Sequence, residues 1–301
     1  MECWNGFMGS TLKAKKILLV AGMTTLGLLV TLVVYVYFSA IQALQDFSFF
    51  SKAVLHPRIS AKEKYDAEPV PGIKKVSLFI PCADGSKMHA WLFKKPGADK
   101  LMIVNHGAGG NLIGRTYIAK AATKANCSSL LYDYRGYARS TGDYNLDTIL
   151  EDGLTVYDYA RKDLGYPAEK IILCGESIGS AVAAQTAAAR PCAGVLILCG
   201  VSQLTVAIRK IFPMSWIIPD SSFAKTKIDN PTTFKSVHVP VLFIHGRLDE
   251  QVPFESSQAN FAAASEPKKI VLLPGCGHDD LGVFDGELFQ KSISDFVESL
   301  K

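Results

Sequence analysis

The pentapeptide GESIG at residues 175–179 has the pattern Gly-x-Ser-x-Gly, with one serine between two glycines. An apolar run, IILC, precedes it, and an alanine-rich stretch with helical character follows it. In this setting the serine occupies a sharp turn between a strand and a helix, and the glycines let neighbouring backbone approach without a Cβ clash. The pattern alone is common, but its setting predicts that Ser177 is a nucleophile presented at the end of a strand.

A serine hydroxyl is a poor nucleophile at neutral pH, so it needs a base, and the base needs a carboxylate to orient it. On a strand–turn–helix scaffold of this kind the expected chain order is serine, then acid, then histidine. Asp249 and His278 lie in the loops that follow two late apolar runs, in that order. We therefore predict Asp249 as the acid and His278 as the general base. Glu250 and Asp229 stay open as alternatives for the acid, although Asp229 precedes the strand.

A developing oxyanion needs two backbone N–H donors. The N–H of Ile178, next to the nucleophile at the start of a helix, is the first predicted donor. The second is expected in the loop HGAGGN at residues 106–111, which follows another apolar run. We predict Ala108, because glycines on both sides let the chain approach the bound carbonyl. Gly107 is the alternative, since a shift of one residue satisfies the same pattern.

Other polar residues of these loops are predicted to have structural roles. His106 and His245 each precede a glycine at a strand end, and we expect them to pack and hydrogen bond within their loops. Asp133 and Arg135 follow another strand. They are expected to form a charge network that braces the nucleophile's turn, with substrate binding as the alternative. Glu176 is expected to support the residues that touch substrate rather than to touch substrate itself.

Short apolar runs alternate with helix-length segments from residue 76 onward. The runs lie at residues 76–80, 89–93, 101–105, 129–132, 171–174, 194–198, 241–244 and 270–273, and the helical stretches at residues 113–125, 146–164, 178–189, 254–264 and 286–300. This alternation predicts an α/β fold, a mostly parallel eight-stranded sheet with helices on both faces. The first two strands are close together and predict an antiparallel hairpin that turns at Asp84-Gly85.

The chain is expected to have four parts. Residues 1–16 form a cytoplasmic segment, residues 17–38 a transmembrane anchor, residues 39–75 a connector, and residues 76–301 the α/β domain. Inside that domain, residues 201–239 contain three prolines and break the alternation. They predict a short lid-like insertion that contributes to an acyl pocket, with a purely structural connection as the alternative.

The anchor is predicted from an uncharged, almost wholly apolar run at residues 17–38. Its length as a helix is about 33 Å, enough to cross the hydrocarbon core of a bilayer. Lysines at positions 13, 15 and 16 flank its N-terminal side, whereas the next cation after the run is Lys52. The positive-inside rule then places the N-terminus in the cytoplasm and the catalytic domain outside it, in a periplasm or a lumen. The alternative is a cleaved signal peptide, for which the apolar run is unusually long.

Composition excludes several function classes. Hydrophobic residues make up 49% of the chain and charged residues 20%, which is enough for a large core. The net charge of +4 comes without a dense basic patch, so no nucleic-acid partner is expected. The seven cysteines show no C-x-x-C spacing and lie mostly in apolar runs, so we expect buried free thiols. No metal or organic cofactor is predicted.

With these motifs together, the chain resembles the α/β-hydrolase superfamily in its membrane-anchored, Bem46-like branch. That branch includes the α/β-hydrolase domain-containing proteins of types 13 and 17 and is close to the serine aminopeptidase-type hydrolases. The motifs that carry the resemblance are HGxGGN at residues 106–111, DYRGY at 133–137, GxSxG at 175–179, HGxxDxxVP at 245–253 and GHD at 277–279. One departure is Ala108, where the branch usually has asparagine; it matters only if that side chain orients the loop.

The resemblance implies a triad of Ser177, His278 and Asp249 and acyl transfer to water through an acyl-enzyme. Members of the branch act on acyl esters, lipids or S-acylated proteins. We therefore predict a hydrolase of carboxylic esters or thioesters, like the enzymes of EC class 3.1, with a lipid or acylated substrate. A serine peptidase or amidase on the same triad is the first alternative, and a non-catalytic binding protein on this fold is the second. The sequence indicates no oligomeric state.

Overall fold

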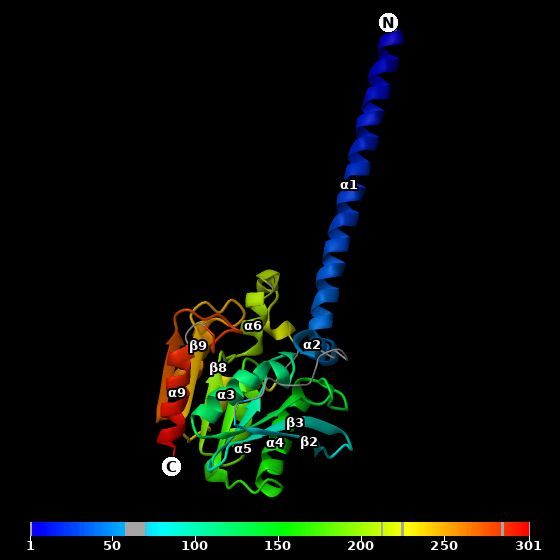
Figure 1. The fold of residues 1–301 in the computed structure, drawn as a ribbon. Coiled ribbons are helices and arrows are strands. Elements are labelled where there is room, and N and C mark those ends of the chain that lie inside the picture. Colours follow the sequence, from blue (N-terminus) through cyan, green and yellow to red (C-terminus); the bar gives the residue numbers. More distant parts are fainter. Residues whose placement is uncertain are drawn as a thin grey trace. The chain divides into compact units, whose positions relative to one another are not determined.

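The structure is a computed structural model that describes residues 2–57, 70, 72–211, 213–223, 226–283 and 286–300 (Figure 1). The chain divides into two compact units. One consists of Met1–Phe50 and Pro219–Ala224, and the other of Ser51–Ile218 and Lys225–Lys301. Each unit is described by itself.

The larger unit is built on an eight-stranded sheet in the order β10-β9-β8-β7-β4-β6-β3-β2. Only β2 with β3 and β3 with β6 pair antiparallel; the other neighbours pair parallel. The strands are β2 (Lys74–Pro81), β3 (Lys87–Lys94), β4 (Leu101–Asn105), β6 (Ser128–Tyr132), β7 (Ile171–Glu176), β8 (Gly194–Leu198), β9 (Val241–Gly246) and β10 (Lys268–Leu273). The predicted α/β fold with a mostly parallel sheet is confirmed, and the β2–β3 hairpin turns at Asp84-Gly85.

The central strands explain why their sequences are continuous apolar runs. Every residue of β4, β6, β7, β8 and β9 is buried. A parallel strand covered on both faces has no polar side to present to water, so alternation disappears. The loops that follow β4, β7 and β9, together with the loop after β10, carry the predicted site residues.

The helices fall into two groups by their contacts. Helix α3 packs on α9, whereas α4 packs on α5, and α5 in turn packs on α7 (Figure 1). The helices of this unit are α3 (Thr116–Lys124), α4 (Leu146–Lys162), α5 (Gly179–Ala189), α6 (Leu204–Ile211), α7 (Asn230–Phe234), α8 (Phe254–Ala263) and α9 (Gly286–Ser299), with 3₁₀ turns η1 (Leu112–Arg115), η2 (Ala168–Lys170) and η3 (Pro213–Ile217). Helix α4 starts at a capping box, in which the Asn145 side chain accepts the N–H groups of Asp147 and Thr148.

Helix α1 (Glu2–Gln45) dominates the smaller unit. Its segment Gly22–Ala43 has a mean hydropathy of 2.0 and buries none of its residues within the structure. Length and composition at this position suit a membrane anchor and a signal sequence alike. The side chains of residues 1–21, including the predicted lysine flank, lie outside the described set. In the same unit, the ring of Phe50 on α2 (Phe47–Val54) packs 6.2 Å from that of Phe223, which follows the 3₁₀ turn η4 (Asp220–Ser222).

A second, two-stranded sheet joins the predicted connector to the loop after β4. Strand β1 (His56–Pro57) pairs in parallel with β5 (Gly109–Gly110). Residues just after α2 therefore form backbone pairs with the loop that contains Ala108. The remainder of the connector, residues 58–69 and 71, lies outside the described residues. The sequence analysis assigned no part of the site to this segment.

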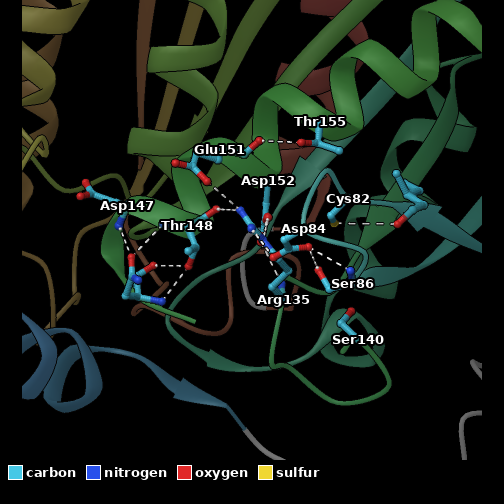
Figure 2. Close-up of polar contacts among 12 residues, drawn as sticks. Cys82, Asp84, Ser86, Arg135, Ser140, Asp147, Thr148, Glu151, Asp152 and Thr155 are labelled. Carbon is cyan, nitrogen blue, oxygen red and sulfur yellow. Dashed lines mark hydrogen bonds and ion pairs between the residues drawn. The ribbon is translucent and has the colours of Figure 1, made fainter. Parts of the chain in front are cut away.

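Arg135 organises a charge network at the edge of the domain (Figure 2). Its guanidinium lies 2.6 Å from the carboxylate of Asp152 and 3.0 Å from those of Glu151 and Asp84. These contacts connect the loop after β6 to α4 and to the β2–β3 turn. A charge network thus forms around Arg135, but it does not include Asp133, and its carboxylates lie on α4 and the β2–β3 turn rather than on the Ser177 turn, so the expectation that it braces that turn is wrong. Asp133 is separate and accepts the N–H of Leu112 at 2.7 Å.

Candidate active site

Ser177 stands between the end of β7 at Glu176 and the start of α5 at Gly179, as its motif predicts. Its φ of 53° lies in the left-handed region, which costs a residue with a Cβ about 1–2 kcal/mol. The N–H of Ser177 donates to the carbonyl of Leu198 on β8 at 2.9 Å and fixes this strained turn to the sheet. Strained backbone of this kind recurs where a side chain must be presented for chemistry.

Asp249 and His278 are brought together by the loops after β9 and β10. His278 Nδ1 donates to Asp249 Oδ2 at 2.7 Å. The other carboxylate oxygen accepts the N–H groups of Gln251 at 2.9 Å and Val252 at 2.8 Å, so the loop holds Asp249 in place. The alternative acids lie elsewhere: Asp229 accepts the N–H of Thr232 at the start of α7, and Glu250 is exposed.

Electrostatics within this pair favour an ionised acid and a basic imidazole. Burial raises the pKa of Asp249, but hydrogen bonds from His245 and His278 outweigh it, and the net pKa lies well below its ordinary value. Burial lowers the pKa of His278, but the hydrogen bond and charge of Asp249 outweigh it, so the net pKa is raised. A raised pKa makes the neutral ring a stronger proton acceptor.

His245, which was expected to pack and hydrogen bond within its loop, is a second histidine on Asp249. Its Nε2 lies 3.3 Å from Asp249 Oδ2 and 3.0 Å from the carbonyl of Val252, while its Nδ1 lies 2.7 Å from the hydroxyl of Ser257. Two acceptors around Nε2 require the proton to be there, so the ring donates towards the acid. In the sequence, the available sign of this contact was that His245 and Asp249 are four residues apart.

Four of the predicted site residues line one cavity of about 960 Å³: Ser177, His278, Ala108 and Ile178. Asp249 lies behind His278. Apolar side chains that also line the cavity are Val54, Leu55, Val201, Leu204, Ile208 and Val252. Charged lining residues are Lys52, Arg115 and Asp279. The segment from Lys52 to Pro57 forms part of the wall of this cavity. No local pattern in the sequence marks that segment as part of a site.

In the loop after β4, the polar backbone groups differ in whether they have a hydrogen-bond partner among the described residues. The N–H of Gly107 donates to the Glu176 carboxylate at 3.1 Å, and the carbonyl of Ala108 accepts the hydroxyl of Tyr137 at 3.0 Å. Within the described residues, the N–H groups of Ala108 and Ile178 have no hydrogen-bond partner. Both residues line the cavity, so these two donors are available to a bound molecule.

A cluster of metal-type donors adjoins the site but does not suit an ion. Cys199, His245 and Asp249 place one such atom each within 4.8 Å of the others. Both His245 nitrogens and the Asp249 carboxylate are already hydrogen bonded. Burial raises the pKa of the Cys199 thiol well above its ordinary value, which disfavours the thiolate a metal needs. We assign no metal to this cluster. Cysteines 82, 127, 174, 192, 199 and 276 are free thiols, and all of these except the half-buried Cys82 are buried.

Comparison with known sequences agrees with this geometry. Residues 96–229 match the family model described as "Serine aminopeptidase, S33". An uncharacterized protein of Mycobacterium tuberculosis is 29% identical over 238 residues, which cover 77% of this chain and 84% of that protein. Human α/β hydrolase domain-containing protein 17B is 27% identical over 191 residues, or 63% of this chain and 64% of that protein.

Solved structures show the same fold. The Pyrococcus furiosus esterase Pf2001 superposes with a TM-score of 0.68 at 16% identity, covering 82% of this chain and 98% of that one. Est1E of Butyrivibrio proteoclasticus, determined with ferulic acid bound, gives a TM-score of 0.60 at 25% identity, covering 74% and 98%. Fold and site together define an α/β hydrolase. The chain has the α/β-hydrolase fold and is similar to serine aminopeptidase-type hydrolases and to α/β hydrolase domain-containing protein 17B.

Proposed function

We propose that this hydrolase cleaves carboxylic esters or thioesters of lipid or acylated substrates through Ser177, His278 and Asp249. The observation that carries the proposal is the 2.7 Å hydrogen bond from His278 to Asp249, made beside a cavity that His278 and Ser177 both line. A histidine oriented by a carboxylate next to a serine on a strained turn is the arrangement that activates a hydroxyl for acyl transfer.

In the proposed mechanism His278 takes the Ser177 proton as the oxygen attacks the carbonyl carbon. Asp249 holds the ring and stabilises its charged form. The N–H groups of Ala108 and Ile178 bind the oxyanion, and His278 then returns the proton to the leaving group. Water repeats the cycle on the acyl-enzyme. The engagement of the Gly107 N–H with Glu176 supports Ala108 over Gly107 as the second donor.

The cavity supports an ester or thioester over an aminopeptide substrate. An aminopeptidase must bind a substrate ammonium group, and a free carboxylate near the serine would do so. Glu176 is buried and already paired with Arg115 at 2.6 Å, so it does not offer such a carboxylate. Asp279 is exposed at the cavity and accepts one hydrogen bond from the neutral Gln251 amide at 3.0 Å. The apolar wall suits an acyl chain, and the ferulic acid bound to Est1E supports an acyl substrate by similarity.

We extend the proposal to location and to the 201–239 insertion. The apolar helix Gly22–Ala43 supports a membrane anchor, and the lysines that precede it in the sequence support an extracytoplasmic catalytic domain. An anchor would keep the enzyme at the membrane that carries such substrates. Leu204 and Ile208 of α6 line the cavity, which supports a role of the insertion in an acyl pocket.

The proposal is tested with the full-length chain in detergent. A fluorophosphonate probe should label the protein, and peptide mass spectrometry should place the adduct on Ser177. Among p-nitrophenyl esters and aminoacyl anilides compared at equal concentration, the esters should be hydrolysed at least tenfold faster. An adduct on another residue contradicts the nucleophile, and faster anilide cleavage contradicts the ester preference in favour of a peptidase.

The rate of labelling should depend on the protonation of His278. Because the ring must be neutral to accept a proton, the rate rises as pH increases through its pKa. That pKa is raised above its ordinary 6.5, so the inflection should lie above pH 6.5, with about a tenfold loss per pH unit below it. Labelling measured from pH 5 to 9 checks this. A flat profile would show that His278 is not the base.

A further inference from the structure

Glu176, directly before the nucleophile, is a buried carboxylate that the proposed mechanism does not use. It is 4% exposed. Its Oε2 accepts Arg115 Nε–H at 2.6 Å and the N–H of Gly107 at 3.1 Å, and its Oε1 accepts the hydroxyl of Tyr117 at 3.0 Å. Both oxygens therefore have partners, and one of those partners is backbone of the loop that lines the cavity.

Gly107 is in direct contact with this group and with the nucleophile. A Cβ built on Gly107 would lie 3.3 Å from Ser177 Cβ, 3.3 Å from Arg115 Nη2 and 3.4 Å from Glu176 Oε2. The close approach leaves the Gly107 N–H pointing at the carboxylate. Because a peptide group is planar, holding this N–H fixes the plane that joins His106 to Gly107.

The next peptide group along the loop carries the Ala108 N–H. Three carbonyls around it are held by side chains: that of His106 by Tyr134, that of Gly107 by the His106 ring, and that of Ala108 by Tyr137. Two tyrosine hydroxyls and a histidine ring nitrogen thus hold carbonyl groups of the loop, and Glu176 holds the N–H of Gly107. The Ala108 N–H has no partner among the described residues, and Ala108 lines the cavity.

We propose that Glu176 is the positioning residue of the oxyanion hole: its carboxylate holds the Gly107 peptide so that the adjacent Ala108 N–H is preorganised for the oxyanion. This inference rests on the proposed function. A preorganised donor stabilises charge that develops in the transition state without having to reorient at that moment. Loss of the contact should therefore lower kcat more than it changes KM.

Arg115 makes this arrangement electrostatically acceptable. A bare carboxylate beneath the loop would repel an oxyanion, whereas a carboxylate paired with a guanidinium adds almost no net charge. Burial raises the pKa of Glu176, but the charge and hydrogen bond of Arg115 outweigh it, so the net pKa is lowered and the carboxylate stays ionised. Glu176 can then accept the Gly107 N–H throughout the pH range in which His278 is neutral.

The test compares Glu176→Ala with a matched variant elsewhere in the full-length protein. Alanine is used because the amide oxygen of a glutamine could still accept the Gly107 N–H. Asp152 also accepts an arginine Nε–H at 2.6 Å and a backbone N–H at 2.9 Å, both from Arg135 (Figure 2), but it does not line the cavity. Burial raises the pKa of Asp152 to about 6, so at pH 8 both carboxylates are ionised in the wild-type chain. Asp152→Ala therefore removes a buried carboxylate and its hydrogen bonds without touching the loop, while two other carboxylates still pair with Arg135.

We expect Glu176→Ala to lower kcat on ester substrate about 10- to 100-fold with KM changed less than twofold, roughly the effect of disturbing one oxyanion donor. Asp152→Ala should lower Tm and keep kcat within twofold. The charge-balanced pair Glu176→Leu/Arg115→Met also lacks the acceptor and avoids an isolated buried cation if the single variant folds poorly. It should also lose kcat. Full kcat in folded Glu176→Ala, or equal losses of kcat in Glu176→Ala and Asp152→Ala, would overturn the proposal.

Hydrogen exchange separates failure of this inference from failure of the proposed function. The Gly107 amide should be protected in the wild-type chain and lose at least tenfold in protection in Glu176→Ala, while Asp152→Ala leaves it protected. This measurement needs no substrate. If wild type hydrolyses no ester but Gly107 behaves as expected, the contact is real and the ester hydrolase assignment is wrong. Unchanged protection in Glu176→Ala contradicts the positioning role itself.

Discussion

Ser177→Ala is expected to abolish ester hydrolysis, with kcat reduced by a factor on the order of 10⁶, because no other hydroxyl replaces the attacking oxygen. Addition of His278→Ala to this variant should cost almost nothing further, since the nucleophile and its base act as one unit. Steady-state rates of p-nitrophenyl ester hydrolysis, taken after any initial burst of product, measure both effects. Retention of a tenth of the wild-type kcat in Ser177→Ala would identify a different nucleophile.

The same position also reports on backbone strain. Alanine keeps the Cβ, so Ser177→Ala should leave Tm within about 1 °C of wild type and serve as a folded, inactive control. Ser177→Gly removes the Cβ at a φ of 53° and should be more stable than Ser177→Ala by about 1 kcal/mol, or about 2–4 °C in Tm. Equal Tm values would mean that the turn is not strained.

Much of the site's location could be predicted because loops after parallel strands converge at one sheet edge. Asp249 and His278 are 29 residues apart, yet their loops follow the adjacent strands β9 and β10, and their side chains meet. Hydrophobic runs identified those strands, and the chain order of the family identified the residues. Their catalytic roles remain predictions. The choice between Ala108 and Gly107 required the structure, because only the contact with Glu176 distinguishes their N–H groups.

The features that the sequence did not reveal depend on contacts without a local pattern. Arg115 reaches Glu176 across 61 residues, and no spacing rule connects a helical arginine with a residue beside a nucleophile. The pairing of β1 with β5 is equally non-local, and two residues are too few to show periodicity. The Arg135 network was expected to brace the nucleophile's turn because both lie near strand ends, but its charged partners come from α4 and the β2–β3 turn.

Gly179→Ala is expected to destabilise the protein by about 4 kcal/mol, or about 10 °C in Tm, through a clash that no side-chain rotation can relieve. A Cβ on Gly179 would lie 2.1 Å from the carbonyl oxygen of Asn105 and 2.6 Å from that of His106, and both atoms are backbone. The matched control is Gly114→Ala, whose Cβ would meet nothing within 4 Å and should change the unfolding free energy by less than about 0.5 kcal/mol. Urea unfolding of both variants measures the difference.

The expected cost at Gly179 has a functional consequence, because the same close approach joins the two halves of the proposed oxyanion hole. Asn105 ends β4 and His106 begins the Ala108 loop, so the start of α5 lies directly against the segment that carries the second donor. Any variant that moves α5 away should separate the Ile178 N–H from the Ala108 N–H. Folded Gly179→Ala should therefore lose kcat as well as stability, whereas wild-type Tm together with wild-type kcat would show that α5 does not approach β4 this closely.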